Sequence, residues 1–112
     1  MALPKKNRLS GRKDIEDVFK KGKTLNSGSF RIRYLVDGSN SKMFGISVSS
    51  KVFKKATERN RVRRRLSEMI RKNIFRIRHN LKAVISVKRG FLDNDDRKIE
   101  KVLIEELNKT AR

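Results

Sequence analysis

The sequence RNRVRRRLSEMI, residues 59–70, contains the strongest structural signal in this chain. Its apolar residues are spaced i, i+4, i+7 and i+8, which places them on one face of a helix with 3.6 residues per turn: Val62, Leu66, Met69 and Ile70. Five of the first seven residues are arginines. The pattern predicts a helix that packs on a core along one face and carries a dense group of cations elsewhere.

The arginines of this helix stand at a spacing that isolated helices disfavour. Arg59 and Arg63 are four residues apart, and like charges at that spacing cost about 0.2–0.5 kcal/mol per pair. A polyanion removes the repulsion, because each phosphate that a cation neutralises releases condensed counterions. The alternative is a solvated charged face, but such faces usually mix signs and only Glu58 and Glu68 lie nearby. We therefore expect a nucleic acid as the partner.

The overall charge supports a polyanionic partner. The chain has 112 residues, enough for one domain, and a formal net charge of +19 at pH 7. Residues 42–89 contain sixteen Lys or Arg against two acids, whereas residues 93–106 contain six of the twelve acids. Such a basic block is typical of a nucleic-acid surface on a folded domain. A membrane surface is the competing partner, but the apolar face of the basic helix lacks Trp and Tyr.

Composition also disfavours several other functions. The chain has no Cys and a single His, so there is little basis for a disulfide, a zinc site or a nucleophile–base pair. We propose no catalytic residue and no metal site, and we interpret His79 as an exposed polar residue. No apolar run approaches the ~20 residues of a membrane span, and none resembles a signal peptide. We expect a cytoplasmic protein.

Hydrophobic periodicity predicts the elements before the basic helix. A first helix is expected over residues 11–21, with Ser10 as its N-cap and Gly22 as a left-handed stop. Apolar and polar residues alternate over 30–36 and over 44–48, which predicts two strands. The turn-forming residues 37–40 lie between these strands and predict a hairpin.

The second half of the chain completes an α+β fold. Residues 52–53 are expected to form a short extra strand or a bend, and Thr57 to cap the basic helix, which extends to about residue 73. A strand is expected over 83–87, and a last helix follows the acidic residues 93–96. The predicted order is helix, strand, strand, helix, strand, helix. We expect one domain over 1–112, frayed at 1–7 and 110–112.

Residues 51–66, KVFKKATERNRVRRRL, closely resemble the signature of the bacterial ribonuclease P protein subunit. That signature has an Arg-Asn-Arg core followed by a basic helix with apolar spacing. Residues 8–22 and 44–49 are similar in order and type to the first helix and a strand of the same family. The resemblance covers residues 8–107, which is nearly the whole chain.

The resemblance implies a fold like domain 2 of ribosomal protein S5, with a left-handed strand–helix–strand crossover against the usual right-handed preference. It implies a protein that binds a catalytic RNA and, with it, cuts the 5′ leader from precursor tRNA. The RNA would carry the active site and its Mg²⁺ ions, and the protein would bind no cofactor of its own. The leader would lie in a cleft between the sheet and the first helix. We expect a monomer in isolation.

The first group of candidate RNA-binding residues lies on and just before the Arg-Asn-Arg helix: Lys51, Lys54, Lys55, Arg59, Asn60, Arg61, Arg63, Arg64 and Arg65. Helical spacing directs Asn60, Arg61 and Arg64 away from the apolar stripe. Arg59 lies near the edge of that stripe. It either binds RNA or packs its stem against the core.

The second group is the candidate leader cleft: Ile15, Phe19, Phe30, Arg31, Arg33, Tyr34, Ser47, Ser49, Lys88 and Arg89. Aromatic rings that stack on bases, together with cations along the backbone, are the usual means of holding single-stranded RNA. Strand alternation puts Phe30 and Tyr34 on the face opposite Arg31 and Arg33, so the whole group cannot line one cleft. Core membership of the two aromatic residues is the open alternative.

Two other functions remain open from the residues alone. A ribosomal or other structural RNA-binding protein, with no role in cleavage, would have the same charge and size. A helix-turn-helix DNA-binding protein would be all helical, which the two alternating segments argue against.

Overall fold

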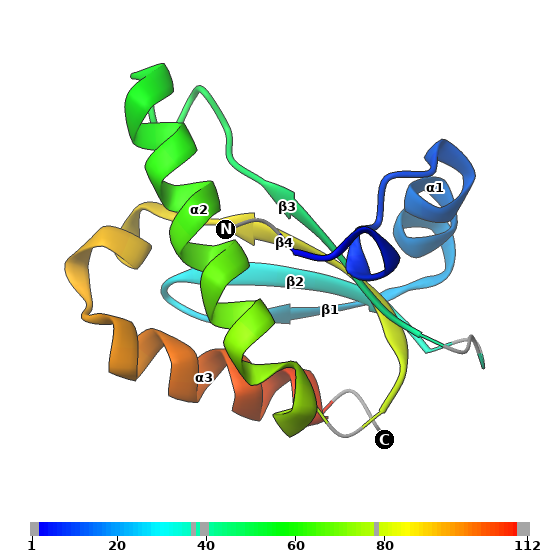
Figure 1. The fold of residues 1–112 in the computed structure, drawn as a ribbon. Helices are drawn as coiled ribbons and strands as arrows, with labels where there is room; N and C mark the ends of the chain where they lie inside the picture. Colours follow the sequence, from blue (N-terminus) through cyan, green and yellow to red (C-terminus); the bar gives the residue numbers. More distant parts are fainter. Residues whose placement is uncertain (1–2, 37, 39–40, 78, 110–112) are drawn as a thin grey trace.

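A four-stranded sheet with helices on both faces organises this chain, and the computed structural model describes residues 3–36, 38, 41–77 and 79–109 (Figure 1). In chain order the elements are η1 (Lys5–Asn7), α1 (Arg12–Lys21), β1 (Lys23–Asn26), β2 (Phe30–Leu35), β3 (Lys42–Ser47), α2 (Ala56–Asn73), η2 (Ile74–Arg76), β4 (Leu81–Val87), η3 (Arg89–Asp93) and α3 (Asp96–Lys109). The α+β class and the predicted sequence of major elements are confirmed.

The strand order is β1-β2-β4-β3. β4 pairs antiparallel with β2 and parallel with β3, so the predicted hairpin between β2 and β3 is wrong. The reason is burial: Ala83, Val84 and Ile85 are all buried, and a strand that is apolar on both faces takes a central position. β3 and β4 are joined through α2. The handedness of this crossover and the likeness to S5 remain predictions.

Two short segments differ from the expectation. β1 was not predicted, because the sequence of Lys23–Asn26 has only one apolar residue, Leu25. β1 is an edge strand, which needs little apolar surface. Residues 52–53 form no strand, and Phe53 is instead fully buried in the core at the bend before α2.

The main core lies between one face of the sheet and the helices α2 and α3 (Figure 1). The predicted apolar stripe of α2 is confirmed, since Val62, Leu66, Met69 and Ile70 are all buried. The core continues through the inward residues of β2 and β4 and through Ile99, Leu103 and Leu107 of α3. One core therefore serves the whole domain.

The opposite face of the sheet is partly covered by α1, through a small cluster of Leu9, Val18 and Val84. The caps of α1 differ from the prediction. Gly11 rather than Ser10 is the N-cap residue, and Gly22 has φ −78°, so it is not left-handed. A side chain at Gly22 would collide with the carbonyl oxygens of Val18 and Tyr34, so glycine permits the close approach of α1 to β2.

The N-terminal segment is packed, so the predicted fraying of 3–7 is wrong. Leu3 is buried in the main core, and the backbone N–H of Leu9 donates to the Phe44 carbonyl at 2.9 Å. The Asn7 amide donates to the Lys42 carbonyl at 2.7 Å. Residues 1–2 and 110–112 and most of the predicted 37–40 turn lie outside the described residues.

The starts of the two long helices are built differently. At α3 the Asp95 carboxylate accepts the Lys98 backbone N–H at 3.0 Å, which confirms an acidic helix start. At α2 the N-cap position is Lys55, with no side-chain cap, so the predicted Thr57 cap is wrong.

Candidate nucleic-acid interface

The start of α2 is held in place by the bend at 49–53. The Ser49 carbonyl accepts the backbone N–H groups of Val52 and Phe53 at 3.2 and 2.9 Å. The Ser49 hydroxyl accepts the Lys51 N–H at 3.1 Å, so this predicted leader residue has a local structural role. The buried Phe53 ring anchors the bend to the core, which fixes the direction in which α2 begins.

Arg59 ties the helix to the same bend. Its guanidinium donates to the Phe53 carbonyl at 2.8 Å and to the Lys54 carbonyl at 3.0 Å. These are carbonyls that no helix N–H satisfies, and a guanidinium with several donors can serve both. Of the two roles left open for Arg59, the structure supports the one at the edge of the core.

The start of α2 and the bend before it present cations to solvent, with Arg63 on the side that faces β3. The side chains in question are exposed, and within the described part of the chain none makes an ion pair: Lys51, Lys54, Lys55, Arg61, Arg63 and Arg64. Asn60 is exposed among them. Val62 and Leu66 are fully buried beneath this group, so the cations stand on an ordered helix rather than on a free tail. We call this set, with Asn60, the α2 cationic face.

A second surface crosses the sheet on the side of α1. Four residues on neighbouring strands stand directly opposite one another, in the order Asn26, Arg31, Ser86 and Ser47. We call them the polar row. Arg31 donates to the Asn26 side-chain oxygen at 3.1 Å, and Arg31 and Ser47 are exposed. Ser47 is two residues from Ser49, so the row leads toward the bend that begins α2.

The α1 edge of the polar row carries an exposed aromatic ring. Phe19 is 49% exposed, which is unusual for so large an apolar side chain. Arg33 holds this edge together, because it donates to the Thr24 hydroxyl at 2.7 Å and to the Phe19 carbonyl. Ile15 is half-buried against the small cluster beneath α1. The ring, the polar row and the α1 edge together could hold an extended strand of RNA.

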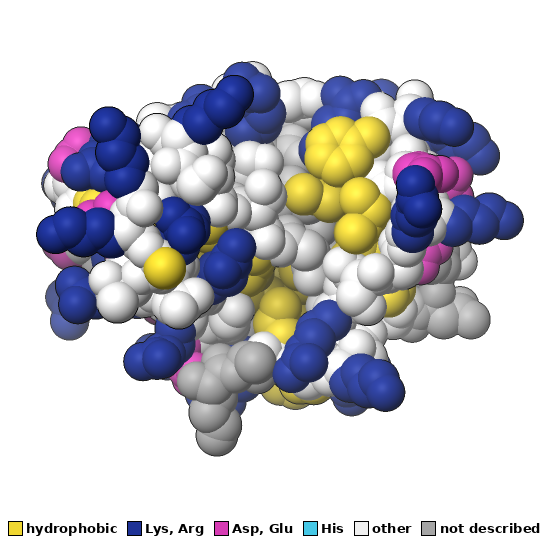
Figure 2. Space-filling model, turned by 90° about the horizontal axis from the view of Figure 1, so that it is seen from above, with side chains coloured by type: hydrophobic (Ala, Val, Ile, Leu, Met, Phe, Trp, Pro, Cys, Tyr) yellow, Lys and Arg dark blue, Asp and Glu magenta, His cyan; other side chains and the backbone are white. Residues whose placement is uncertain are grey.

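Figure 2 shows the molecule from the side at which α2 begins. Lys and Arg side chains surround a hollow in which hydrophobic side chains are visible. Cations around a partly apolar hollow suit a ligand that has both phosphates and bases.

Comparison with known proteins decides the family. The family model described as Ribonuclease P matches residues 3–111. This chain belongs to the Ribonuclease P family. A ribonuclease P protein component from Trichormus variabilis is 33% identical over 109 residues. The coverage is 79% of this chain and 78% of the relative. One from Synechococcus elongatus is 35% identical over 99 residues, covering 85% and 80%.

Solved structures agree with this assignment. The ribonuclease P protein from Thermotoga maritima superposes with a TM-score of 0.79 at 29% identity and covers 91% of this chain and 96% of its own. The Staphylococcus aureus protein shares the fold, with a TM-score of 0.76 at 22% identity over 95% of both chains. Protein components of ribonuclease P are parts of an endoribonuclease complex, whose general role is the 5′ maturation of tRNA.

Several predicted site residues lie elsewhere in this chain than expected. Phe30 is 1% exposed and Tyr34 is 9% exposed, and both belong to the main core. Their rings are not available to stack on a base, so their placement in the leader cleft is wrong. The solvent-facing side of β2 is the side that carries Arg31 and Arg33, which agrees with the alternation of residues along this strand.

Arg65 is also engaged within the molecule. Its guanidinium pairs with the Asp96 carboxylate at 2.5 Å and lies 4.8 Å from the centre of the Phe91 ring. It thus connects α2 to the start of α3, and its predicted role in RNA binding is not supported. The partner, 31 residues away, could not be identified from helical spacing alone.

Lys88 and Arg89 separate at the end of β4. Lys88 donates to the Ser27 carbonyl at 2.7 Å, which braces the turn between β1 and β2. Arg89 donates to the Val52 carbonyl at 3.1 Å and lies 5.7 Å from the centre of the Phe53 ring. Arg89 therefore belongs with the bend before α2 rather than with the polar row.

Sequence reasoning missed two members of the polar row, Asn26 and Ser86. Ser86 was detectable, because it is the one polar residue in the otherwise apolar run 83–87. Asn26 was not, since β1 itself was not predicted.

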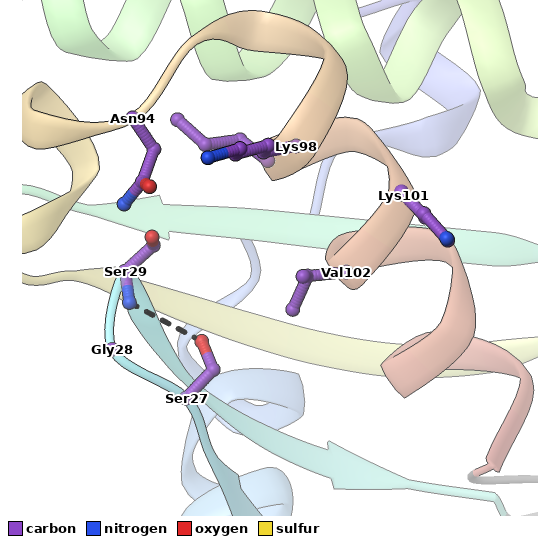
Figure 3. Close-up of a pocket in the computed structure, with 8 residues that line it drawn as sticks. Ser27, Gly28, Ser29, Asn94, Lys98, Lys101 and Val102 are labelled. Atoms are coloured by element: carbon purple, nitrogen blue, oxygen red, sulfur yellow. Dashed lines mark hydrogen bonds between the residues drawn. The ribbon is translucent and has the colours of Figure 1, made fainter.

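A separate pocket of about 340 Å³ lies between the β1–β2 turn and α3 (Figure 3). The turn contributes Ser27, Gly28 and Ser29, and the Ser29 N–H donates to the Ser27 hydroxyl at 3.3 Å. Lys98 and Val102 line the side of α3. No residue of the α2 cationic face or the polar row contributes to it.

Among the described residues, no helix is both long and apolar enough to cross a membrane.

Proposed function

We propose that this chain is the protein subunit of ribonuclease P that binds the RNA subunit through the α2 cationic face and the 5′ leader of precursor tRNA along the polar row. The first assignment is carried by one observation: exposed cations without ion-pair partners in the described structure stand over a fully buried apolar stripe. Because the helix backbone that carries these guanidinium groups is already ordered, binding of phosphates does not require the backbone to become ordered first.

The leader assignment is supported by the shape of the open sheet face. An extended single strand needs a backbone-tracking charge and a surface on which bases can stack. Arg31 supplies the charge in the middle of the polar row, and Phe19 supplies the ring at its α1 edge. The serine hydroxyls of the row add neutral hydrogen bonds to sugars or phosphates.

We assign the chemistry to the RNA subunit and its Mg²⁺ ions. The protein positions the two RNAs. We further propose that it acts in the cytoplasm, away from membranes, and is a monomer until it meets the RNA.

Reconstitution tests this function. The chain is combined with a bacterial ribonuclease P RNA at low Mg²⁺, and cleavage of precursor tRNA is measured. We expect the chain to raise the rate, and Arg61→Ala to reduce that gain. Arg97→Ala is the matched control, because Arg97 is an exposed arginine on α3. No gain from the unaltered chain, or equal losses in both variants, would refute the proposal.

Leader binding has its own test. Arg31→Ala should weaken binding of a precursor that has a leader, and it should reduce the slope of log affinity against log salt by about 0.7, the value of one phosphate contact to a single strand. It should leave binding of mature tRNA unchanged. Arg12→Ala, an exposed arginine on α1, is the control. Equal weakening for the precursor and the mature tRNA would remove the polar row from the leader site.

A further inference from the structure

Phe75 is the most exposed large apolar side chain in the described structure, at 92%. It lies on η2, the turn that follows α2. Burial of a phenylalanine side chain stabilises a fold by about 2 kcal/mol, and Phe75 does not contribute this stabilisation. A single exposed apolar residue is common on protein surfaces, so the inference depends on what holds Phe75 and what surrounds it.

The backbone beneath Phe75 is fixed on both sides. Lys42, at the start of β3, donates to the Ile74 carbonyl at 3.0 Å, and Asn108 of α3 donates to the Arg76 carbonyl at 3.0 Å. Ile77 follows the turn and is 1% exposed. The turn is thus tied to the sheet, to α3 and to the core. The ring is held out into solvent by a rigid support, which is how a binding surface is preorganised.

Phe75 lies just beyond the end of α2, on the same stretch of chain as the exposed cations of that helix. Asn73 has φ −111° and ψ 11°, so the α-helix ends there and Phe75 follows on η2. Arg64 and Asn73 are about 14 Å apart along the helix axis at about 1.5 Å per residue. An extended RNA segment that contacts the α2 cationic face can span this distance and reach Phe75.

The charges around Phe75 favour a polyanion. Residues 69–92 contain seven Lys or Arg and no acid. Lys72 precedes Phe75 by three residues, at the end of α2, and it is exposed. Arg71 is less available because it is paired with Glu68.

Acidic residues near the turn lie to one side of it. Glu100 and Glu105 of α3 share a surface depression with Arg76. Arg76 therefore shares its surroundings with both acids and with Arg97 and Lys101, whereas Lys72 does not line this depression. A ligand with negative charge is favoured on the Lys72 side of Phe75.

We propose that Phe75 is a stacking platform for an unpaired RNA base, with Lys72 holding a neighbouring phosphate. Every base has a face that can stack on an aromatic ring, and such contacts tolerate different sequences. The site extends RNA contact from the start of α2 to its far end. The inference rests on the proposed function for the identity of the ligand as RNA, and it adds a second point of attachment to it.

The absence of tryptophan from this chain gives a direct test. Phe75→Trp introduces a single fluorescent reporter, and this variant is titrated with an oligoadenylate of about ten nucleotides and with a blunt RNA duplex. We expect the single strand to quench the fluorescence and the duplex to have little effect. Val36→Trp is the matched control, since Val36 is exposed at the end of β2, and its fluorescence should stay unquenched. Equal quenching in the two variants, or none in Phe75→Trp, would overturn the proposal.

Binding measurements with side-chain variants separate stacking from ordinary hydrophobic contact. Phe75→Leu and Phe75→Ala should both weaken binding of the oligoadenylate about fivefold to a hundredfold, and Phe75→Tyr should retain it. Leucine that binds as well as phenylalanine would refute stacking. Self-association that is lost in Phe75→Leu would show instead that a second copy of the chain occupies the ring.

Failure here can be told apart from failure of the proposed function. If the Phe75→Trp variant gives no response while the unaltered chain still raises precursor cleavage in reconstitution, the stacking platform is wrong and the proposed function stands. If reconstitution fails while the fluorescence of Phe75→Trp is quenched, the proposed function is wrong and this position still binds single-stranded RNA.

Discussion

The arginines at the start of α2 form two pairs with the same spacing, Arg59 with Arg63 and Arg61 with Arg65. In each pair one member is engaged within the molecule and the other is exposed. Arg59 serves the carbonyls of the bend, and Arg65 pairs with Asp96 of α3. Arg61 and Arg63 are exposed. Residues of one type, on one helix, thus divide into fold-building and ligand-facing roles.

This division explains how the helix tolerates its own charge. Repulsion within each pair costs about 0.2–0.5 kcal/mol. An internal hydrogen bond or ion pair holds one guanidinium of the pair toward the protein, which offsets that cost. The remaining cations are left to interact with phosphates. The two classes should therefore respond in opposite ways to substitution.

The largest difference is expected between Arg59→Ala and Arg63→Ala. Both remove the same repulsion, but only Arg59→Ala leaves the Phe53 and Lys54 carbonyls without their donor. Hydrogen bonds from charged groups are strong, and for this half-buried site we expect a loss of about 1–2 kcal/mol in unfolding free energy. Arg63→Ala should be neutral or slightly stabilising. Urea unfolding measures both, and equal midpoints would contradict the division.

The helical part of this division was accessible to sequence reasoning. The apolar stripe of α2 repeats over more than two turns, so its buried face and the exposure of Asn60, Arg61 and Arg64 were predicted correctly. The roles of Arg59 and Arg65 were not, because their partners are set by the bend before α2 and by α3. Hydrophobic periodicity predicts which face of a helix is buried, but it does not predict which distant residues its side chains contact.

The sheet shows the same limit. Alternation in β2 correctly separated Phe30 and Tyr34 from Arg31 and Arg33, and left open which face was the core. The strand order could not be predicted, because β4 inserts between two strands that are adjacent in sequence. Pairing of distant strands depends on the whole core rather than on a local turn.

A smaller effect is expected for Arg65→Ala relative to Arg61→Ala. Arg65→Ala removes an ion pair with Asp96, whose side chain is 60% exposed, and a contact with the Phe91 ring. We therefore expect a loss of about 1 kcal/mol in unfolding free energy. Arg61→Ala removes the same repulsion and no internal contact. Asp96→Asn isolates the ion pair from the ring contact. If Arg61→Ala destabilises the fold as much as Arg65→Ala, the assignment of Arg65 to the fold is wrong.

RNA binding should reverse this order. Arg61→Ala and Arg63→Ala should each reduce the slope of log affinity against log salt by about 0.7–0.9, the value of one phosphate contact. Arg65→Ala should leave the slope unchanged, because its charge already faces Asp96. The measurement is titration of the RNA subunit at several salt concentrations. A smaller slope for Arg65→Ala would return that residue to the interface.

The smallest effect concerns Arg71, a third engaged arginine of α2, whose partner Glu68 titrates. The pKa of Glu68 is lowered from 4.5 to about 2, chiefly by its hydrogen bond with Arg71. The folded state therefore favours the ionised carboxylate. Its contribution to stability is complete above pH 4.5 and is lost as the pH falls toward 2.

Glu68→Gln should therefore flatten the acid dependence of stability between these two pH values, with Glu105→Gln of α3 as the control. Urea midpoints measured from about pH 5 to about pH 2 provide the comparison. An unchanged acid slope in Glu68→Gln would mean that the pairing with Arg71 contributes no measurable stability. Arg71 would then count as a cation available to ligands, and the ligand-facing class would extend along the whole of α2.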